Sequence, residues 1–169
     1  IEHNNVRNAV GVFDVSHMGE FRAKGPKAFE FVQRCTSNDI ATLYDGKVLY
    51  TVLPNGKGGI VDDMLVYRVS EQDWNWMSKI AEEMGLKVGT EFTNESDHYG
   101  QLAVQGPLAL KAMQKLTDTT IEDMEYYTFK FLTFAGVENV LLSTTGYTGA
   151  GGCEIYFDKK DADKIWDAV

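Results

Sequence analysis

Apolar and polar residues alternate along several short stretches of the chain, and turn-forming residues separate most of these stretches. Such alternation is typical of half-buried β-strands, because successive side chains of a strand point to opposite faces. It predicts strands over residues 47–53, 60–69, 129–134, 139–143 and 153–157. Apolar residues recur at helical spacing over residues 27–34, 74–84 and 108–116. Paired strands with fewer helices predict an α+β chain with antiparallel sheets flanked by helices, rather than a doubly wound parallel sheet.

A strand that ends in Gly-Pro and continues as a helix is predicted twice. Gly25-Pro26 and Gly106-Pro107 each end an alternating stretch and open a helical one. Proline suits the first helical turn, where its missing N–H would have no partner. When the two Gly-Pro pairs are aligned, the helices share an alanine and a glutamine, Gln33 and Gln114. We infer an internal pseudo-repeat; the alternative is that strand, Gly-Pro and helix form a common joint.

Composition and charge narrow the class of protein. The chain has 169 residues, 44% hydrophobic and 24% charged, which suffices for a core and argues against disorder. Its net charge of -9 disfavours nucleic acid or an anionic membrane as a partner. No stretch approaches the roughly 18 consecutive apolar residues of a membrane helix, and the N-terminus has no signal-like segment. We therefore expect a soluble, unsecreted protein.

The cysteines and the two chain ends add two expectations. Cys35 and Cys153 lie far apart and outside any Cys/His cluster, so we expect core thiols, with no disulfide and no metal site. The first residue is not Met, and the last, Val169, ends within a helical pattern. We expect the chain to be part of something longer.

Two adjacent carboxylates, Asp62 and Asp63, follow the glycine pair Gly58-Gly59 inside an otherwise apolar stretch. Aspartate is depleted in strands, and an unpaired carboxylate that faces a core is unfavourable, so the pair indicates a site. Because side chains alternate along a strand, one carboxylate can face a cleft while the other faces solvent. The alternative is that both lie on an exposed turn after the glycines.

A second candidate site lies in the glycine-rich segment that follows Thr144. Four glycines in the seven residues 146–152 allow the backbone to take positive φ and to approach a ligand closely. A planar ligand would use the ring and hydroxyl of Tyr147 and the carboxylate of Glu154, which can accept two parallel N–H bonds from an amino-heterocycle such as a pterin. A phosphate loop is disfavoured because no Lys-Ser/Thr follows. A plain hairpin turn remains the alternative.

Two further sets of residues admit more than one interpretation. His17 could act as a general base, but no partner is visible and a structural histidine near Asp14 is favoured. Tyr126 and Tyr127 could line a cleft or pack in the interior, and the sequence favours packing.

Several motifs together resemble the aminomethyltransferase family, the T-proteins of the glycine cleavage system. They occur in the family's order, from about Arg7 to the end of the chain. They are Gly11-Val-Phe-Asp-Val-Ser-His-Met-Gly-Glu-Phe21, Thr36-Ser-Asn-Asp39, Gly46-Lys47 with Tyr50-Thr51, Gly58-Gly-Ile-Val-Asp-Asp63, Leu102-Ala-Val-Gln-Gly-Pro107 and Thr145-Gly-Tyr-Thr-Gly149. The first motif and the Gly-Gly-Ile-x-Asp-Asp strand are the most specific.

The resemblance implies a fold and an activity. Residues 1–169 would form the folate-binding region with an interleaved ferredoxin-like subdomain, divided into about 19–100 and the remainder. The reaction would transfer the methylene of an aminomethyl-dihydrolipoyl arm to tetrahydrofolate, releasing ammonia. Tetrahydrofolate would be the co-substrate, lipoylated H-protein the partner, and no metal would take part. The location would be cytoplasmic in a bacterium or the mitochondrial matrix in a eukaryote.

The resemblance also implies roles for individual residues. Asp63 matches the family's catalytic aspartate, which hydrogen-bonds the folate near N10 and assists nucleophilic attack on the methylene carbon. Tyr147 and Glu154 fall on the tyrosine and glutamate of the pterin site. Four more residues fall on or beside positions of the pocket wall, namely Met18, Leu65, Tyr67 and Tyr127.

The chain departs from the family pattern in several places. On the order of a dozen residues, one strand and its turn, are missing after Gln72. Thr144 stands where an arginine is usual, and Ala150-Gly151 replaces an acidic pair. The family's C-terminal barrel domain is absent from the chain. These departures leave related folate proteins as rivals, either a demethylase or the folate domain of a sarcosine-type dehydrogenase. Iron-sulfur assembly relatives are disfavoured, because their Lys-Gly-Cys-Tyr-x-Gly-Gln motif is missing.

Overall fold

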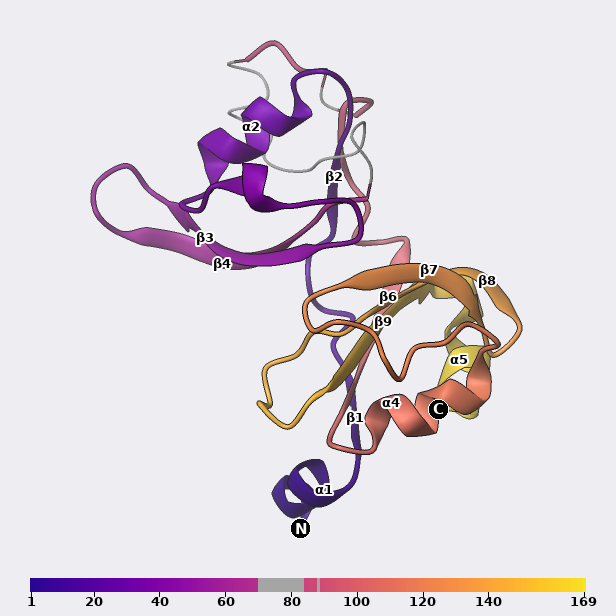
Figure 1. Ribbon diagram of the computed structural model, residues 1–169. Helices are drawn as coiled ribbons and strands as arrows, with labels where there is room; N and C mark the ends of the chain where they lie inside the picture. The colour runs from indigo at the N-terminus through magenta and orange to yellow at the C-terminus, as the bar shows by residue number, and fades with distance from the viewer. Residues whose placement is uncertain (70–83, 88) are drawn as a thin grey trace. The chain divides into compact units, whose positions relative to one another are not determined.

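The computed structural model describes residues 1–69, 84–87 and 89–169 (Figure 1). The chain divides into two compact units, and each is considered by itself. The outer unit consists of Ile1–Met18 and Asp97–Val169, and the inserted unit consists of Gly19–Ser96. Apart from Met84, the helix predicted over residues 74–84 lies outside the described residues.

A five-stranded sheet forms the centre of the outer unit. Its strand order is β1-β6-β9-β8-β7, and every neighbouring pair is antiparallel. The strands are β1 (Gly11–Asp14), β6 (Tyr99–Gln105), β7 (Phe129–Phe134), β8 (Val137–Ser143) and β9 (Gly152–Asp158). The strands predicted over residues 129–134, 139–143 and 153–157 are thus confirmed, with β8 beginning two residues earlier than expected.

One face of this sheet packs in the apolar core, and the opposite face, called the polar face below, carries Gln101, Gln105 and Glu154. Leu102 and Val104 of β6 lie in the core with Cys153 and Ile155 of β9. Side chains of α4 (Ala109–Met113) and α5 (Ala162–Ala168) pack against them. The residues between these apolar positions point to the opposite face, because strand side chains alternate. A short helix, α1 (Glu2–Asn8), precedes β1.

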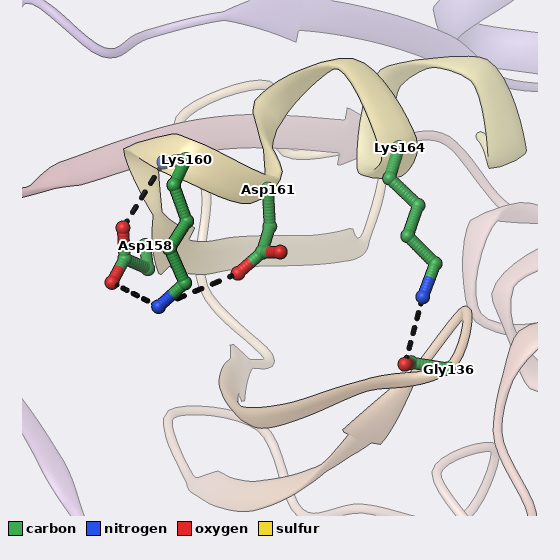
Figure 2. A network of polar contacts seen from close by, with 5 residues as sticks. All are labelled: Gly136, Asp158, Lys160, Asp161 and Lys164. Carbon is green, nitrogen blue, oxygen red and sulfur yellow. Dashed lines mark hydrogen bonds and ion pairs between the residues drawn. The ribbon is translucent and has the colours of Figure 1, made fainter.

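Polar contacts attach the C-terminal helix to the sheet (Figure 2). The Nζ of Lys164 on α5 donates to the carbonyl oxygen of Gly136, in the β7–β8 turn, at 2.8 Å. Asp158 caps η3 (Lys159–Asp161) by accepting from the backbone N–H of Lys160 at 3.0 Å. The Lys160 Nζ lies 2.6 Å from Asp158 and 3.9 Å from Asp161. These ion pairs are exposed, so they orient the chain more than they stabilise it.

The inserted unit contains two antiparallel pairs of strands. The pair β3 (Val48–Pro54) and β4 (Ile60–Tyr67) confirms the strands predicted over residues 47–53 and 60–69, although β4 ends earlier. The second pair is β2 (Phe21–Ala23) with β5 (Phe92–Asn94). Helix α2 (Ala28–Cys35) and the turn η1 (Ile40–Thr42) complete its described elements. Antiparallel sheets with few helices confirm the predicted α+β class.

The predicted pseudo-repeat is confirmed by matching glutamine contacts at the ends of two helices. Gln33 donates from Nε2 to the carbonyl oxygen five residues on at 2.9 Å, and its Oε1 accepts from the N–H of Ile40 at 3.0 Å. Gln114 makes the same two contacts, at 3.0 Å and at 2.8 Å from the N–H of Ile121. Both isoleucines are fully buried. Gln114 also begins the turn η2 (Gln114–Leu116), so the helix predicted over 108–116 ends as a 3₁₀ turn.

We expect Gln33→Ala and Gln114→Ala each to lower the free energy of unfolding by about 1–3 kcal/mol. Each change leaves one backbone N–H without its side-chain partner, together with one carbonyl at Gln33 and two at Gln114. Urea denaturation followed by circular dichroism measures the loss. Glu30→Ala on the exposed side of α2 is the control and should change stability by less than about 0.5 kcal/mol. Equal, small losses in all three variants would contradict a structural role for the glutamines.

Candidate functional site

Three of the residues predicted for the site share one face of β4. Asp63, Leu65 and Tyr67 occupy alternate positions of the strand. The residues between them, Met64 and Val66, are buried in the core of the inserted unit. The other face therefore carries a carboxylate at one end and a tyrosine at the other. This arrangement follows from the two-residue period of a strand.

Asp63 is exposed and takes part in two local hydrogen bonds. Its backbone N–H donates to Oδ1 of the neighbouring Asp62 at 2.9 Å. Tyr50 on β3 shares a hydrogen bond with the Asp63 carboxylate, and this bond is the main reason why the pKa of Tyr50 is raised. Tyr50 lies opposite Leu65 in the ladder, two pairs away from Asp63, and so on the same face. Both aspartates lie in β4, which confirms the predicted strand, and both are exposed, which the alternative of an exposed turn had also expected.

Glu154 lies on the polar face of the sheet in the outer unit. It is only 5% exposed, and its Oε2 accepts a hydrogen bond from the Thr145 hydroxyl. Its Oε1 accepts from the Gln101 Nε2 at 3.3 Å. Burial raises the pKa of the Glu154 carboxyl, and the hydrogen bond from Thr145 opposes this shift. The structure thus holds a carboxyl group in a buried polar network, the environment expected of a binding residue.

The glycine-rich segment adopts the backbone predicted for it. Gly146, Gly149, Gly151 and Gly152 all have positive φ. At Gly146 (φ 150°) the Gln105 amide packs so closely that a Cβ would collide with it. The close approach made possible by this glycine is therefore to a side chain of the protein itself.

Gln105 organises this segment from the neighbouring strand. Its Nε2 donates to the carbonyl oxygens of Thr145 at 3.1 Å and Cys153 at 3.0 Å. Its Oε1 accepts from the Thr148 hydroxyl at 3.0 Å. Sequence reasoning missed this role. The feature that could have indicated this role is Gln105 of the Leu-Ala-Val-Gln-Gly-Pro motif, a polar residue at the end of a buried strand.

A pocket of about 240 Å³ lies beside the glycine-rich segment. Its lining residues are Gln105, Tyr126, Thr145, Gly146, Gly149 and Gly151. Small-molecule sites usually measure about 300–1,000 Å³, so this pocket suits one part of a larger ligand. Thr145 connects the pocket wall to the buried carboxyl group of Glu154.

The predicted aromatic residues of the outer unit differ in environment. Tyr147 is 66% exposed on the glycine-rich segment. Tyr127 is half-buried and takes φ 62°, and its ring meets that of Tyr126 edge to face at 4.6 Å. When Gln33 is aligned with Gln114, Tyr127 occupies the position of Gly46, which also has a positive φ. The N–H of Tyr127 donates to the Thr144 carbonyl oxygen at 3.1 Å.

Thr144 is buried and has a structural role. Its hydroxyl donates to the Glu125 carbonyl oxygen at 2.6 Å and accepts from the Thr128 N–H at 3.2 Å. These contacts tie the β8 end to the segment before β7. Thr144 therefore supports the position of Tyr127.

The predicted site residues fall into two groups by unit. Asp63, Leu65 and Tyr67 belong to the inserted unit, while Met18, Tyr127, Tyr147 and Glu154 belong to the outer unit. Met18 is 44% exposed after β1. Two further residues, which the sequence analysis did not select, contact members of these groups. Tyr50 is hydrogen-bonded to Asp63, and Gln101 is hydrogen-bonded to Glu154.

Glu20 is a further titratable group, at the start of the inserted unit. Its Oε2 is buried and meets no hydrogen-bond donor within the described ranges. Burial raises the pKa of Glu20 from 4.5 to about 7. Between these values the folded chain keeps a proton that the unfolded chain has released, so stability falls as pH rises through this window.

We expect Glu20→Gln to flatten this pH dependence. The loss of unfolding free energy between pH 5 and 8 should shrink by on the order of 1 kcal/mol, after discounting for solvent screening of a half-buried group. Urea denaturation at several pH values measures it. Glu30→Gln, on the exposed side of α2, should leave the slope unchanged. Parallel slopes for the parent and Glu20→Gln would contradict the assignment.

The described residues form neither a metal-binding cluster nor a membrane-spanning helix. No group of three or more His, Cys, Asp and Glu side chains in the described ranges is placed to hold a metal ion. None of the helices in those ranges combines the length and apolarity needed to cross a membrane.

Comparisons with known proteins agree on the class of fold. The structure superposes on the glycine cleavage system aminomethyltransferase T from Bartonella henselae with a TM-score of 0.81 and 25% identity, over 99% of this chain and 47% of that one. It also matches a chain of the heterotetrameric sarcosine oxidase from Corynebacterium sp. U-96, with a TM-score of 0.65, over 96% of this chain and 82% of that one. At 15% identity the second match shows a shared fold alone.

Sequence comparisons identify the family. The model of the GCVT N-terminal domain matches residues 1–169, so the chain belongs to this family. The aminomethyltransferase of Bacteroides fragilis is 54% identical and that of Flavobacterium psychrophilum 47%, each over 99% of this chain. The chain spans about half the length of these relatives, 49% in each case. Both alignments run over 181 positions, more than the 169 residues of the chain, so within the matched region the relatives carry residues that it lacks.

Proposed function

We propose that the protein transfers the methylene of an aminomethyl group, carried on the dihydrolipoyl arm of lipoylated H-protein, to tetrahydrofolate with release of ammonia. The match of the whole chain to the GCVT N-terminal domain carries this proposal. The bacterial relatives that are 54% and 47% identical to it over 99% of its length are aminomethyltransferases, and they favour a cytoplasmic enzyme.

In this proposal Asp63 is the catalytic residue. Its carboxylate is exposed on β4, where a substrate can reach it, and it is held by Tyr50. A carboxylate near N10 of the folate would orient the amine and stabilise the positive charge that develops as the nitrogen attacks the methylene carbon. The protein supplies no covalent nucleophile in this scheme. The leaving groups are ammonia and the thiolate of the dihydrolipoyl arm, which takes up a proton.

Glu154 and Tyr147 would bind the pterin ring. A buried carboxyl group can accept two N–H bonds from the amino edge of a pterin, and low exposure strengthens such bonds. Tyr147 offers an exposed ring for stacking. Met18, Leu65, Tyr67 and Tyr127 would contact the folate, each from a half-buried or partly exposed position that leaves surface for a ligand.

A second candidate is oxidation or demethylation of a methylated amine with folate as the one-carbon acceptor. The observation behind this candidate is the fold that the chain shares with a chain of a sarcosine oxidase. The two functions differ in the one-carbon donor, since only aminomethyl transfer requires H-protein.

The test is a transfer assay with the longest natural form of the protein. It should form 5,10-methylenetetrahydrofolate and ammonia from aminomethylated, lipoylated H-protein and tetrahydrofolate. A methylated amine such as sarcosine should give no product. Turnover of sarcosine without H-protein would overturn the proposal in favour of the second candidate.

A further inference from the structure

Gln101 is a buried residue whose backbone is held from both neighbouring segments. It lies on β6 and pairs with Tyr156 of β9. On its other side, its N–H donates to the Ser16 hydroxyl at 2.9 Å, and its carbonyl oxygen accepts from the N–H of Val15 at 3.0 Å. Only 2% of the residue is exposed. Its Cα position is therefore tightly determined.

The side-chain amide of Gln101 is equally constrained. Its Nε2 donates to Glu154 Oε1 at 3.3 Å and to the Tyr156 hydroxyl at 3.0 Å, which uses both amide hydrogens. Turning the amide over would place two oxygens, those of Gln101 and Glu154, against each other. The observed orientation is thus the one that the neighbours favour.

This orientation leaves one strong acceptor without a donor. The Oε1 of Gln101 is buried, and no donor in the described part of the chain reaches it. Buried polar atoms in native proteins are almost always paired, so such an atom points to a partner that the described residues do not supply. It belongs to the amide that contacts Glu154, the residue proposed to bind the pterin, and it lies on the same polar face of the sheet.

We propose that Gln101 Oε1 accepts a ring N–H from the folate and makes the site selective for the reduced pterin. This inference rests on the proposed function. A tetrahydropterin ring has N–H groups at N5 and N8, and N5 receives the one-carbon group, which leaves N8–H to donate. In oxidised folic acid N8 carries a lone pair, which an amide oxygen repels. The amino edge read by Glu154 is common to both forms.

The test compares two ligands and two variants of the full chain by isothermal titration calorimetry. The parent protein should bind tetrahydrofolate more tightly than folic acid. Gln101→Met keeps the length of the side chain and removes the amide, so we expect it to weaken tetrahydrofolate binding about tenfold and folic acid binding less than about twofold. The control Gln114→Met removes an amide whose contacts are internal, and the ratio of the two affinities should stay at the parent value.

Two outcomes would overturn the inference. If Gln101→Met weakens the binding of tetrahydrofolate and of folic acid by the same factor, Gln101 acts only by positioning Glu154. If the parent protein binds both ligands equally, the site does not read the oxidation state of the ring. A parent protein that binds neither ligand, together with failure of the transfer assay, would instead refute the proposed function itself.

Discussion

Asp63→Asn should lower the rate of aminomethyl transfer by about 100- to 10,000-fold while tetrahydrofolate affinity stays within about tenfold of the parent. Asparagine has almost the same shape, so β4 and its pairing with β3 should be preserved. It lacks the negative charge that stabilises the attacking nitrogen. The expected result is therefore a loss of kcat with little change in KM for folate, measured by the transfer assay and by calorimetry.

Two variants on the same hairpin sharpen this result. Asp62→Asn alters the adjacent carboxylate, which lies on the opposite side of the strand, and should leave turnover within about threefold. Tyr50→Phe removes the hydrogen bond to Asp63 but keeps the ring, and should lower kcat by about tenfold. Retained turnover in Asp63→Asn, or an equal loss in Asp62→Asn, would remove Asp63 from its proposed role.

Glu154→Gln should weaken tetrahydrofolate binding by about 10- to 100-fold without unfolding the protein. Glutamine offers the pterin one acceptor and one donor in place of two acceptors. One of the two hydrogen bonds from the pterin is therefore lost, and the NH2 group of the glutamine faces an N–H group of the pterin. Because burial raises the pKa of Glu154, the carboxyl group destabilises the fold once rising pH ionises it. Glu154→Gln should therefore remain at least as stable as the parent at pH 8.

Calorimetry measures the affinity and urea denaturation measures the stability of these proteins. Glu138→Gln on the neighbouring strand β8 changes an exposed carboxylate and should alter neither quantity. Parent-like folate affinity in Glu154→Gln would exclude Glu154 from the site. Lower stability at pH 8 would indicate that the carboxylate is needed for folding rather than for binding.

Local patterns were sufficient to predict most of the described elements. The alternation around Asp63 predicts both β4 and the common face of Asp63, Leu65 and Tyr67, because the period of a strand is a local property of the backbone. The match between Gln33 and Gln114 predicts the pseudo-repeat for a similar reason, since both capping contacts lie within seven residues along the chain. The helix predicted over 108–116 is longer than the observed α-helix. Gln114 hydrogen-bonds the loop that follows it, and the α-helix ends before this residue.

The sequence by itself therefore determined the strands, the repeated unit and, through its resemblance to a family, the identities of the candidate residues. Only the tertiary structure showed that Tyr50 contacts Asp63 and that Gln101 contacts Glu154. The second contact joins residues 53 positions apart, and its existence depends on the register between β6 and β9. A shift of one residue in that register would turn Glu154 into the apolar core, and no local pattern encodes which register forms.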